Sequence, residues 1–339
     1  MVDLAFGGFF PTLKVPPVDL TGKVAIITGA NSGIGLQIAR CIAEQGATVY
    51  LACRNISKAK EAASQIISAN PLCKDRVHVL SVDMSLLSSV RDFADTLKNI
   101  NLKIDLLFHN AGVVSAPAGK EFTSEGFPML YATNFLGSFF LTHLLEPCLA
   151  LDARVIFTAS TGQYSGGFSP TFSLQSIKDR LEPGFHVRMR ALKDRESVPD
   201  GATYSQTKCM QAAFAKLLQS HFDRIDKDSG HQARRVAHAF SPGFTKTPIF
   251  ENVSATSLWE DPTFWILKAT TALATDVSQG AATAVWLAGT QENEVVGIGH
   301  GGSYWLRMVR RLSNADMMSQ STLERLWVRW EADCGIEWR

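Results

Sequence analysis

A glycine-rich loop near the N-terminus, set between an apolar run and a helix-forming segment, limits the folds that this chain can adopt. The apolar run covers residues 23–28 and has the continuous character of a strand that is covered on both faces. The loop places Gly29, Gly33 and Gly35 ahead of a helical pattern at 36–45. Glycine permits the tight turn and lets the backbone come close to a bound pyrophosphate. The pattern therefore predicts a phosphate site at the N-terminus of this helix.

Apolar runs continue to alternate with helical patterns along the chain. Strands are expected at 46–54, 77–82, 104–108, 154–158, 236–240 and 303–305, and helices at 86–97, 135–145, 210–220 and 321–332. This alternation is typical of an α/β fold with a doubly wound parallel sheet, a Rossmann-type single domain. We expect that domain at 20–306, with an N-terminal extension at 1–19 and a C-terminal helical tail at 307–339. Ligands bind such sheets at the carboxyl ends of the strands.

Two charged residues at strand ends bear on which nucleotide the loop would hold. The second strand ends at Arg54, and no carboxylate follows before Glu61, whereas NAD-selective sites place an acidic residue there for the ribose 2′-hydroxyl. A guanidinium suits a 2′-phosphate, so the sequence favours NADP(H), with NAD(H) as the alternative. The alternative is that Arg54 is a solvated surface residue with no role in nucleotide binding. Asp83 is placed to bind adenine or to cap the helix at 86–97.

A tyrosine and a lysine four residues apart predict proton-transfer chemistry. Tyr204 and Lys208 would lie on one face of a helix, because four residues make just over one turn. A phenol ordinarily titrates near ~10, and a nearby positive charge lowers that pKa towards working pH. Such a tyrosine can give or take a proton at a carbonyl or an alcohol. The pair also occurs by chance on solvated helices, so its weight depends on the other motifs.

Taken together, these segments resemble the short-chain dehydrogenase/reductase family. The resemblance covers residues 20–305 and rests on Thr28-Gly-x-x-x-Gly-Ile-Gly35, Asn110-Ala-Gly112, Asn134, Ser160, Tyr204-x-x-x-Lys208 and Pro242-Gly-x-x-x-Thr247. The retinol-dehydrogenase-like branch is indicated by Ala52-Cys-Arg54, by the segment 133–137 and by the segment 323–327. The chain is also similar to reductases of fungal secondary metabolism.

The resemblance implies a role for each matched residue. Tyr204 would be the general acid in ketone reduction and the base in alcohol oxidation, while Lys208 would lower its pKa and bind the nicotinamide ribose. Ser160 would hydrogen-bond the substrate oxygen, and Asn134 would hold a water that links Lys208 to solvent. Thr247 and the backbone near Pro242 would bind the carboxamide. The expected cofactor-binding residues are Gly29, Asn31, Ser32, Gly33, Ile34, Gly35, Arg54, Asp83, Asn110, Ala111, Gly112, Tyr204, Lys208, Pro242, Gly243, Thr245 and Thr247.

Three features near these motifs leave alternatives open. His109 stands where the family usually has another asparagine, either as a tolerated substitution in a buried turn or as a proton shuttle. Thr161 and Ser165 compete with Ser160, which we prefer because it closes the strand at 154–158. An insertion at about 165–201 lengthens the spacing between the serine and the tyrosine. We expect it to be a solvated loop or short helix; an edge of the substrate mouth or a partner surface are the alternatives.

Aromatic residues suggest the class of substrate. The substrate-loop region at about 248–275 carries Trp259, Phe264 and Trp265, and the insertion carries Phe168 and Phe172. They indicate a bulky apolar or aromatic carbonyl or alcohol, of retinoid, steroid or polyketide-like type. A role in the core or in a dimer seam is the alternative interpretation.

Composition narrows the remaining function classes. The 33 basic and 32 acidic residues give a net charge of +1 without long charge runs, so nothing indicates a nucleic-acid partner. The 6 cysteines lack metal-ligand spacing and are expected as free thiols in a reducing compartment, which favours the cytoplasm and no metal. The apolar stretch at 1–10 is expected to pack on the body, with contact to an intracellular membrane as the alternative. Family members often form dimers or tetramers, so a homo-oligomer is an open alternative.

The sequence thus predicts an NADP(H)-dependent oxidoreductase that interconverts a ketone or aldehyde and an alcohol. The rival from another class is a catalytically idle relative that binds nucleotide and serves as an interaction module. A dehydratase or epimerase that uses transient oxidation is disfavoured, because those relatives usually space the first glycines differently.

Overall fold

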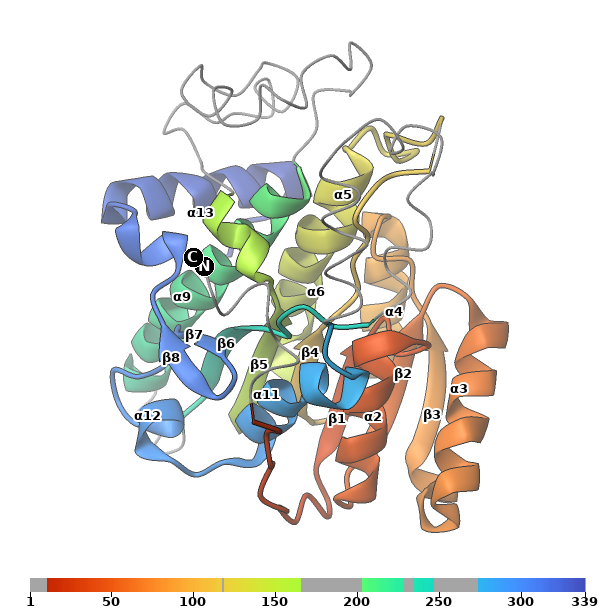
Figure 1. Ribbon diagram of the computed structural model, residues 1–339. Coiled ribbons are helices and arrows are strands. Elements are labelled where there is room, and N and C mark those ends of the chain that lie inside the picture. Colours follow the sequence, from red (N-terminus) through yellow and green to blue (C-terminus); the bar gives the residue numbers. More distant parts are fainter. Residues whose placement is uncertain (1–10, 118, 166–202, 229–233, 247–273, 339) are drawn as a thin grey trace.

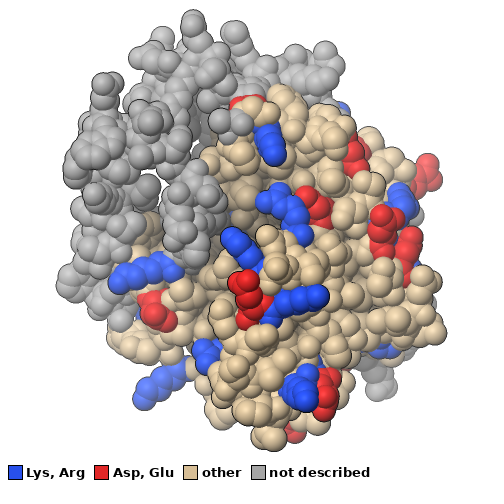
Figure 2. Space-filling model, turned by 90° about the vertical axis from the view of Figure 1, so that its right-hand side faces the viewer, with Lys and Arg blue, Asp and Glu red and all other residues tan. Residues whose placement is uncertain are grey.

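The computed structural model describes residues 11–117, 119–165, 203–228, 234–246 and 274–338. Helices cover both faces of a central sheet in these residues, as Figure 1 shows. None of the described helices combines the length and the apolar character needed to cross a bilayer. Acidic and basic side chains are interspersed on the face seen in Figure 2, in keeping with the near-zero net charge.

The described part of the chain forms one eight-stranded sheet in the order β3-β2-β1-β4-β5-β6-β7-β8. All neighbouring strands are parallel except β7 and β8. The chain first builds outwards from β1 to β3 and then returns to place β4 beside β1. This reversal of strand order opens a crevice at the carboxyl ends of β1 and β4. The strands are β1 Val24–Thr28, β2 Thr48–Cys53, β3 Val77–Ser81, β4 Ile104–His109, β5 Leu149–Thr158, β6 Val236–Ser241, β7 Tyr304–Leu306 and β8 Val309–Arg311.

Two hydrophobic cores lie on the two faces of the sheet. One contains side chains from α4, α6, α9 and α13, and the other contains side chains from α2, α3 and α11. Strand β1 contributes to both, because Ile26 joins the first core whereas Ala25 and Ile27 join the second. The helices are α2 Gly33–Glu44, α3 Ile56–Ala69, α4 Leu87–Asn99, α5 Met129–Tyr131, α6 Gly137–Leu145, α9 Tyr204–Asp228, α11 Val277–Gly289, α12 Asn293–Val296 and α13 Gln320–Cys334.

The doubly wound parallel sheet is the one that the sequence predicts, and the differences are local. Strand β5 begins at Leu149, earlier than expected, and α9 is longer than the predicted 210–220 at both ends. Helix α3 was not predicted because it buries mainly small residues on a largely polar surface, and Asn55 caps it by accepting from the Lys58 N–H at 3.0 Å. Helix α11 buries most of its residues, so it has no polar face to mark its period.

Helix α13 docks on the helices that carry the candidate site. Leu323, Leu326, Trp327 and Trp330 are buried against α6 and α9. The Trp330 ring lies 4.5 Å from that of Phe135, centroid to centroid. This tail therefore belongs to the main core rather than to a separate unit.

A buried polar contact also fixes the tail. The Tyr131 hydroxyl donates to the Asp333 carboxylate at 2.7 Å, and burial raises the pKa of Asp333 to about 6. Further along, the Trp338 indole donates to Glu146 Oε2 at 2.5 Å. The tail is thus held by directional hydrogen bonds as well as by apolar packing.

Candidate active site

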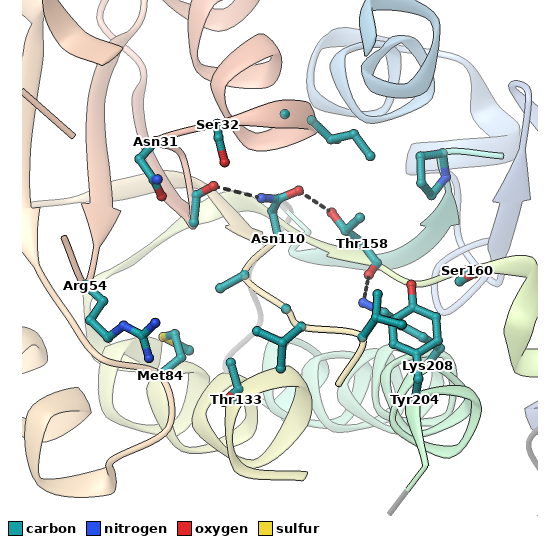
Figure 3. A pocket seen from close by; sticks show the side chains of 18 of the residues that line it. Asn31, Ser32, Arg54, Met84, Asn110, Thr133, Thr158, Ser160, Tyr204 and Lys208 are labelled. Carbon is teal, nitrogen blue, oxygen red and sulfur yellow. Dashed lines mark hydrogen bonds between the residues drawn. The ribbon is translucent and has the colours of Figure 1, made fainter. Parts of the chain in front are cut away.

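A pocket of about 1060 Å³ occupies the crevice at the carboxyl ends of the strands. Its size lies at the upper end of the range for small-molecule pockets, which allows a cofactor together with a substrate. Figure 3 shows Arg54 at one end and Ser160, Tyr204 and Lys208 at the other. All the expected site residues within the described segments line it except Gly35 and Asn134. Thr247 itself lies outside the described residues.

The glycine loop fits a phosphate because side chains are sterically excluded from it. Gly29 has φ +65°, and an added Cβ would lie 2.9 Å from the Ala111 Cα. A Cβ on Gly35 would lie 2.5 Å from the Gly29 carbonyl oxygen, which only glycine avoids. Ser32 precedes α2 and makes no side-chain cap, so the first N–H groups of α2 remain available to an anion. The loop therefore suits the pyrophosphate of a dinucleotide.

Asn110 ties three strands together beneath this loop. Its Nδ2 donates to the Thr28 carbonyl at 3.1 Å, and its Oδ1 accepts from the Thr158 hydroxyl at 3.3 Å. The crevice floor is consequently held by one amide that touches the ends of β1, β4 and β5. Its neighbours Ala111 and Gly112 line the pocket, as expected for a chain that passes close to the cofactor.

The charged end of the pocket contains two cations and one carboxylate. The Arg54 side chain is 71% exposed, and its Nη1 lies 3.8 Å from Asp83 Oδ2. Lys58 lines the same end, a residue that the sequence reasoning missed although it follows Arg54 by four residues. An arginine that is mostly free in solvent and next to a second cation is suited to a phosphate.

Asp83 does not cap a helix, so that alternative is wrong. Its Oδ1 accepts from the Ser85 N–H at 2.9 Å and from the Ser85 hydroxyl at 2.6 Å. The N-terminus of α4 is instead capped from outside, because Glu125 accepts from the Leu87 N–H at 2.6 Å and from the Ser88 N–H at 3.0 Å. Asp83 lines the pocket, where the adenine interpretation would place it.

The chemical end of the pocket brings together the serine, the tyrosine and the lysine. Helix α9 begins at Tyr204, and the Lys208 Nζ lies 5.4 Å from the centroid of the tyrosine ring. The Ser160 side chain lies close enough to Tyr204 to act on the pKa of its phenol. The Ser160 oxygen also accepts the Gly162 N–H at 3.0 Å, which fixes its direction. Its rival Thr161 lines the pocket as well, whereas the side chain of Ser165 is not described.

The pKa of the tyrosine differs from the expectation. Burial raises the pKa of Tyr204, and the nearby Ser160 side chain only partly opposes that effect. Burial also lowers the pKa of Lys208 to about 7, because the amine is surrounded by neutral groups. The lysine is therefore only partly protonated near neutral pH. The structure therefore does not show the expected lowering of the tyrosine pKa by a full positive charge.

Asn134 lies behind the lysine, in the π-helical turn η3 at Ala132–Leu136. Its side chain accepts from the Val113 N–H at 2.7 Å and donates to the Val113 carbonyl at 2.9 Å. It also donates to the Thr207 hydroxyl at 3.1 Å. The side chain therefore fastens the loop after β4 to α9. Its main-chain carbonyl is connected to Lys208 through the Gln211 side chain.

The loop after β6 is fastened to the serine loop by Ser241, a contact that sequence reasoning missed. The Ser241 oxygen accepts from the Thr161 N–H and from the Gly243 N–H, each at 3.1 Å. Pro242, Gly243 and Thr245 line the pocket, and the Thr245 hydroxyl donates to the Pro242 carbonyl at 3.0 Å. The aromatic residues expected to cover the substrate lie outside the described residues.

His109 is a buried neutral side chain rather than part of the pocket wall. It is fully buried, its ring stacks on Phe157 with centroids 4.9 Å apart, and it does not line the pocket. The Thr142 hydroxyl donates to the Ser138 carbonyl at 2.7 Å, so it accepts from the His109 Nε2–H at 2.8 Å. The Nδ1 atom has no hydrogen-bond partner among the described residues. This geometry favours the buried-turn interpretation over a proton shuttle.

We expect His109→Asn to reduce the acid sensitivity of folding. Burial lowers the pKa of His109 to about 3, below the ~6.5 of an unfolded chain, so the unfolded state binds more protons between these values. Stability therefore rises with pH across that window and falls as pH drops below ~6.5, by about 2 kcal/mol at pH 5. Urea unfolding at pH 5 and pH 7.5 should show a smaller difference for the variant. Equal differences in both proteins would contradict the assignment.

Comparisons with known proteins agree with this geometry. The family model described as short chain dehydrogenase matches residues 23–171. The short chain dehydrogenase/reductase dpchH of Colletotrichum higginsianum is 32% identical over 287 residues, which cover 82% of this chain and 67% of that protein. Mouse retinol dehydrogenase 12 is 29% identical over 326 residues, covering 95% and 89% of the two chains.

A solved structure gives the same result for the fold. The crystal structure of an uncharacterized protein from Mycobacterium paratuberculosis aligns with a TM-score of 0.65 and 25% identity, covering 97% of this chain and all of that one. The order of motifs, the doubly wound sheet and these relatives lead to one conclusion. The chain belongs to the retinol-dehydrogenase-like branch of the short-chain dehydrogenase/reductase family, whose members are NAD(P)-binding oxidoreductases of alcohol and carbonyl groups.

Proposed function

We propose that this protein is an NADP(H)-dependent oxidoreductase that interconverts a ketone or aldehyde and an alcohol on a bulky apolar or aromatic substrate. One observation carries the proposal. A single pocket has a mostly solvent-exposed arginine at one end and a serine, a tyrosine and a lysine at the other. Between them lies the glycine loop, in which Gly29 and Gly35 leave no room for a side chain.

The residues at the chemical end supply the proton and hold the reacting oxygen. The bound nicotinamide would supply or accept the hydride. Ser160, whose direction is fixed by Gly162, would donate a hydrogen bond to the substrate oxygen. Tyr204 would donate its proton to that oxygen during reduction and remove one during oxidation. A raised pKa keeps the phenol protonated at neutral pH, which suits the direction of reduction.

The preference for NADP(H) rests on Arg54 and Lys58. Both line the pocket at the end of β2, where the adenosine ribose of a dinucleotide would lie. Asp83, the carboxylate at this end, is engaged by Ser85 through both the main chain and the side chain. A 2′-phosphate would therefore meet two cations.

The proposed substrate class rests on the apolar wall of the pocket and on the relatives. Val113, Val114, Met129 and Phe244 contribute to the pocket lining. Relatives include mouse retinol dehydrogenases 11 and 12, whose names point to an extended apolar alcohol. A retinoid, a steroid or a polyketide-like carbonyl would satisfy such a wall.

The direct test is oxidation of NADPH by the purified protein in the presence of a carbonyl panel. The panel should contain aromatic ketones, retinal, a 3-ketosteroid and a small polar ketone as the matched polar control. We expect turnover that favours the apolar compounds. Cofactor binding is measured in parallel by the fluorescence of NADPH. Binding without turnover on any compound would instead favour the catalytically idle nucleotide-binding module.

A further inference from the structure

Gln211 is a fully buried amide on α9 that lies between Lys208 and the main chain of Asn134. Its Oε1 accepts from the Lys208 Nζ at 3.0 Å, and its Nε2 donates to the Asn134 carbonyl at 2.8 Å. The direction of this amide follows from chemistry alone, because an ammonium can only donate and a carbonyl can only accept. Both ends of the Gln211 side chain are consequently committed.

Few groups other than Gln211 stabilise the protonated form of Lys208. Its Nζ also donates to the Thr158 carbonyl of β5 at 2.7 Å, and its remaining donor faces the pocket. Tyr204 is the titratable group that faces it, from the first turn of α9. The loop after β4 contributes Gly112, and η3 contributes the Asn134 carbonyl, both uncharged. No carboxylate among the described residues forms an ion pair with Lys208.

We propose that Gln211 is a positioning residue for the reaction, which holds the protonated amine of Lys208 against the pocket and connects it directly to the Asn134 carbonyl. The resemblance assigns that connection to a water held by Asn134. In this chain an amide side chain spans the gap, and an amide neither gains nor loses a proton near neutral pH. The inference rests on the proposed function, because it assigns Lys208 to the cofactor and to Tyr204.

Changing the side chain at position 211 should shift the pKa of Lys208, downwards or upwards according to the substitution. A hydrogen bond to an ammonium stabilises its charged form, so loss of the acceptor lowers the pKa of Lys208 below about 7. A carboxylate at position 211 would raise it. Protonated Lys208 favours the anionic cofactor, so the affinity for NADPH should fall as pH rises through that pKa.

The test compares Gln211→Leu, Gln211→Ala and Gln211→Glu by the pH dependence of NADPH affinity and of kcat. A plot of NADPH affinity against pH should have a descending limb, the pH range over which Lys208 loses its proton. In Gln211→Leu, we expect this limb to move about one unit to lower pH and kcat at pH 7.5 to fall about tenfold or more. In Gln211→Glu, the limb should move to higher pH. Gln211→Ala should be less impaired than Gln211→Leu, because alanine leaves room for a water that can form both hydrogen bonds.

A packing role makes the opposite prediction for two of these variants. Leucine fills the space better than alanine, so a structural residue would tolerate leucine better. The proposal would be overturned if Gln211→Ala were more impaired in kcat and NADPH affinity than Gln211→Leu. It would also be overturned if the limbs of the variants coincided with the wild-type limb. Gln219→Leu is the matched control, since Gln219 is another buried amide of α9 with both ends bonded. It should lower thermal stability without moving the limb.

The two proposals can fail separately. The affinity for NADPH can be measured whether or not any carbonyl is turned over, so the Gln211 comparison remains decisive for a protein without activity. Absence of turnover in the wild-type protein would contradict the oxidoreductase proposal alone. Turnover in the wild-type protein with unshifted limbs in all three variants would contradict the Gln211 proposal alone.

Discussion

Tyr204→Phe is expected to lower kcat for carbonyl reduction by about 10²–10⁴-fold while NADPH binding stays nearly unchanged. The substitution removes only the hydroxyl, which lies with Ser160 and Lys208 at the chemical end of the pocket. The glycine loop and Arg54 at the other end of the pocket are not altered. Stopped-flow or steady-state oxidation of NADPH gives the rate, and NADPH fluorescence gives the affinity.

The control removes the same hydroxyl from a tyrosine outside the pocket. Tyr50 lies on β2 and stacks on His78 with ring centroids 4.8 Å apart. Tyr50→Phe should keep the rate of the wild-type protein. Retained turnover in Tyr204→Phe would remove this phenol from the role of general acid, and Ser160 would then become the first candidate for that role.

Arg54→Asp is expected to reverse the cofactor preference. The change removes the cation from a 2′-phosphate and places a carboxylate beside it, so the affinity for NADPH should fall about a hundredfold or more. The new carboxylate can accept hydrogen bonds from the ribose hydroxyls of NADH, as acidic residues do at this strand end. The ratio of kcat/KM for NADPH over NADH should therefore fall below one. Both cofactors are tested on the same carbonyl.

A charge-matched variant separates this local effect from a change in net charge. Arg40 lies on α2, pairs with Glu44 at 3.2 Å and does not line the pocket. Arg40→Asp makes the same change in net charge and should leave the cofactor ratio as it is. If Arg54→Asp left the ratio unchanged, Lys58 would become the residue to test for contact with the phosphate.

The parts of the fold that were predictable from sequence are those with strong local signals. Apolar parallel strands and a glycine loop depend on nearby residues, and they predicted the sheet and the crevice that forms at its reversal. Helices α3 and α11 were missed because one buries small residues and the other is buried almost all round. Neither helix shows a clear helical repeat of large apolar residues in its sequence.

The finer chemistry of the site depends on contacts between distant segments, which no local pattern encodes. The sequence predicted that Tyr204 and Lys208 would be neighbours, but it could not weigh burial against charge in setting their pKa values. Likewise, Glu125 caps α4 from a separate loop, which left Asp83 free to line the pocket. The contact of Gln211 with the Asn134 carbonyl requires η3 and α9 to be packed together.

Helix α13 has a consequence for how the protein is made. It covers Phe135, Phe139 and Phe214, aromatic residues on η3, α6 and α9. The ribosome synthesises α13 after all these elements, so the nascent chain exposes an uncovered aromatic surface until the tail emerges from the exit tunnel. Chaperone contact during translation should therefore concentrate in that interval, and catalytic competence should arise only after α13 has emerged.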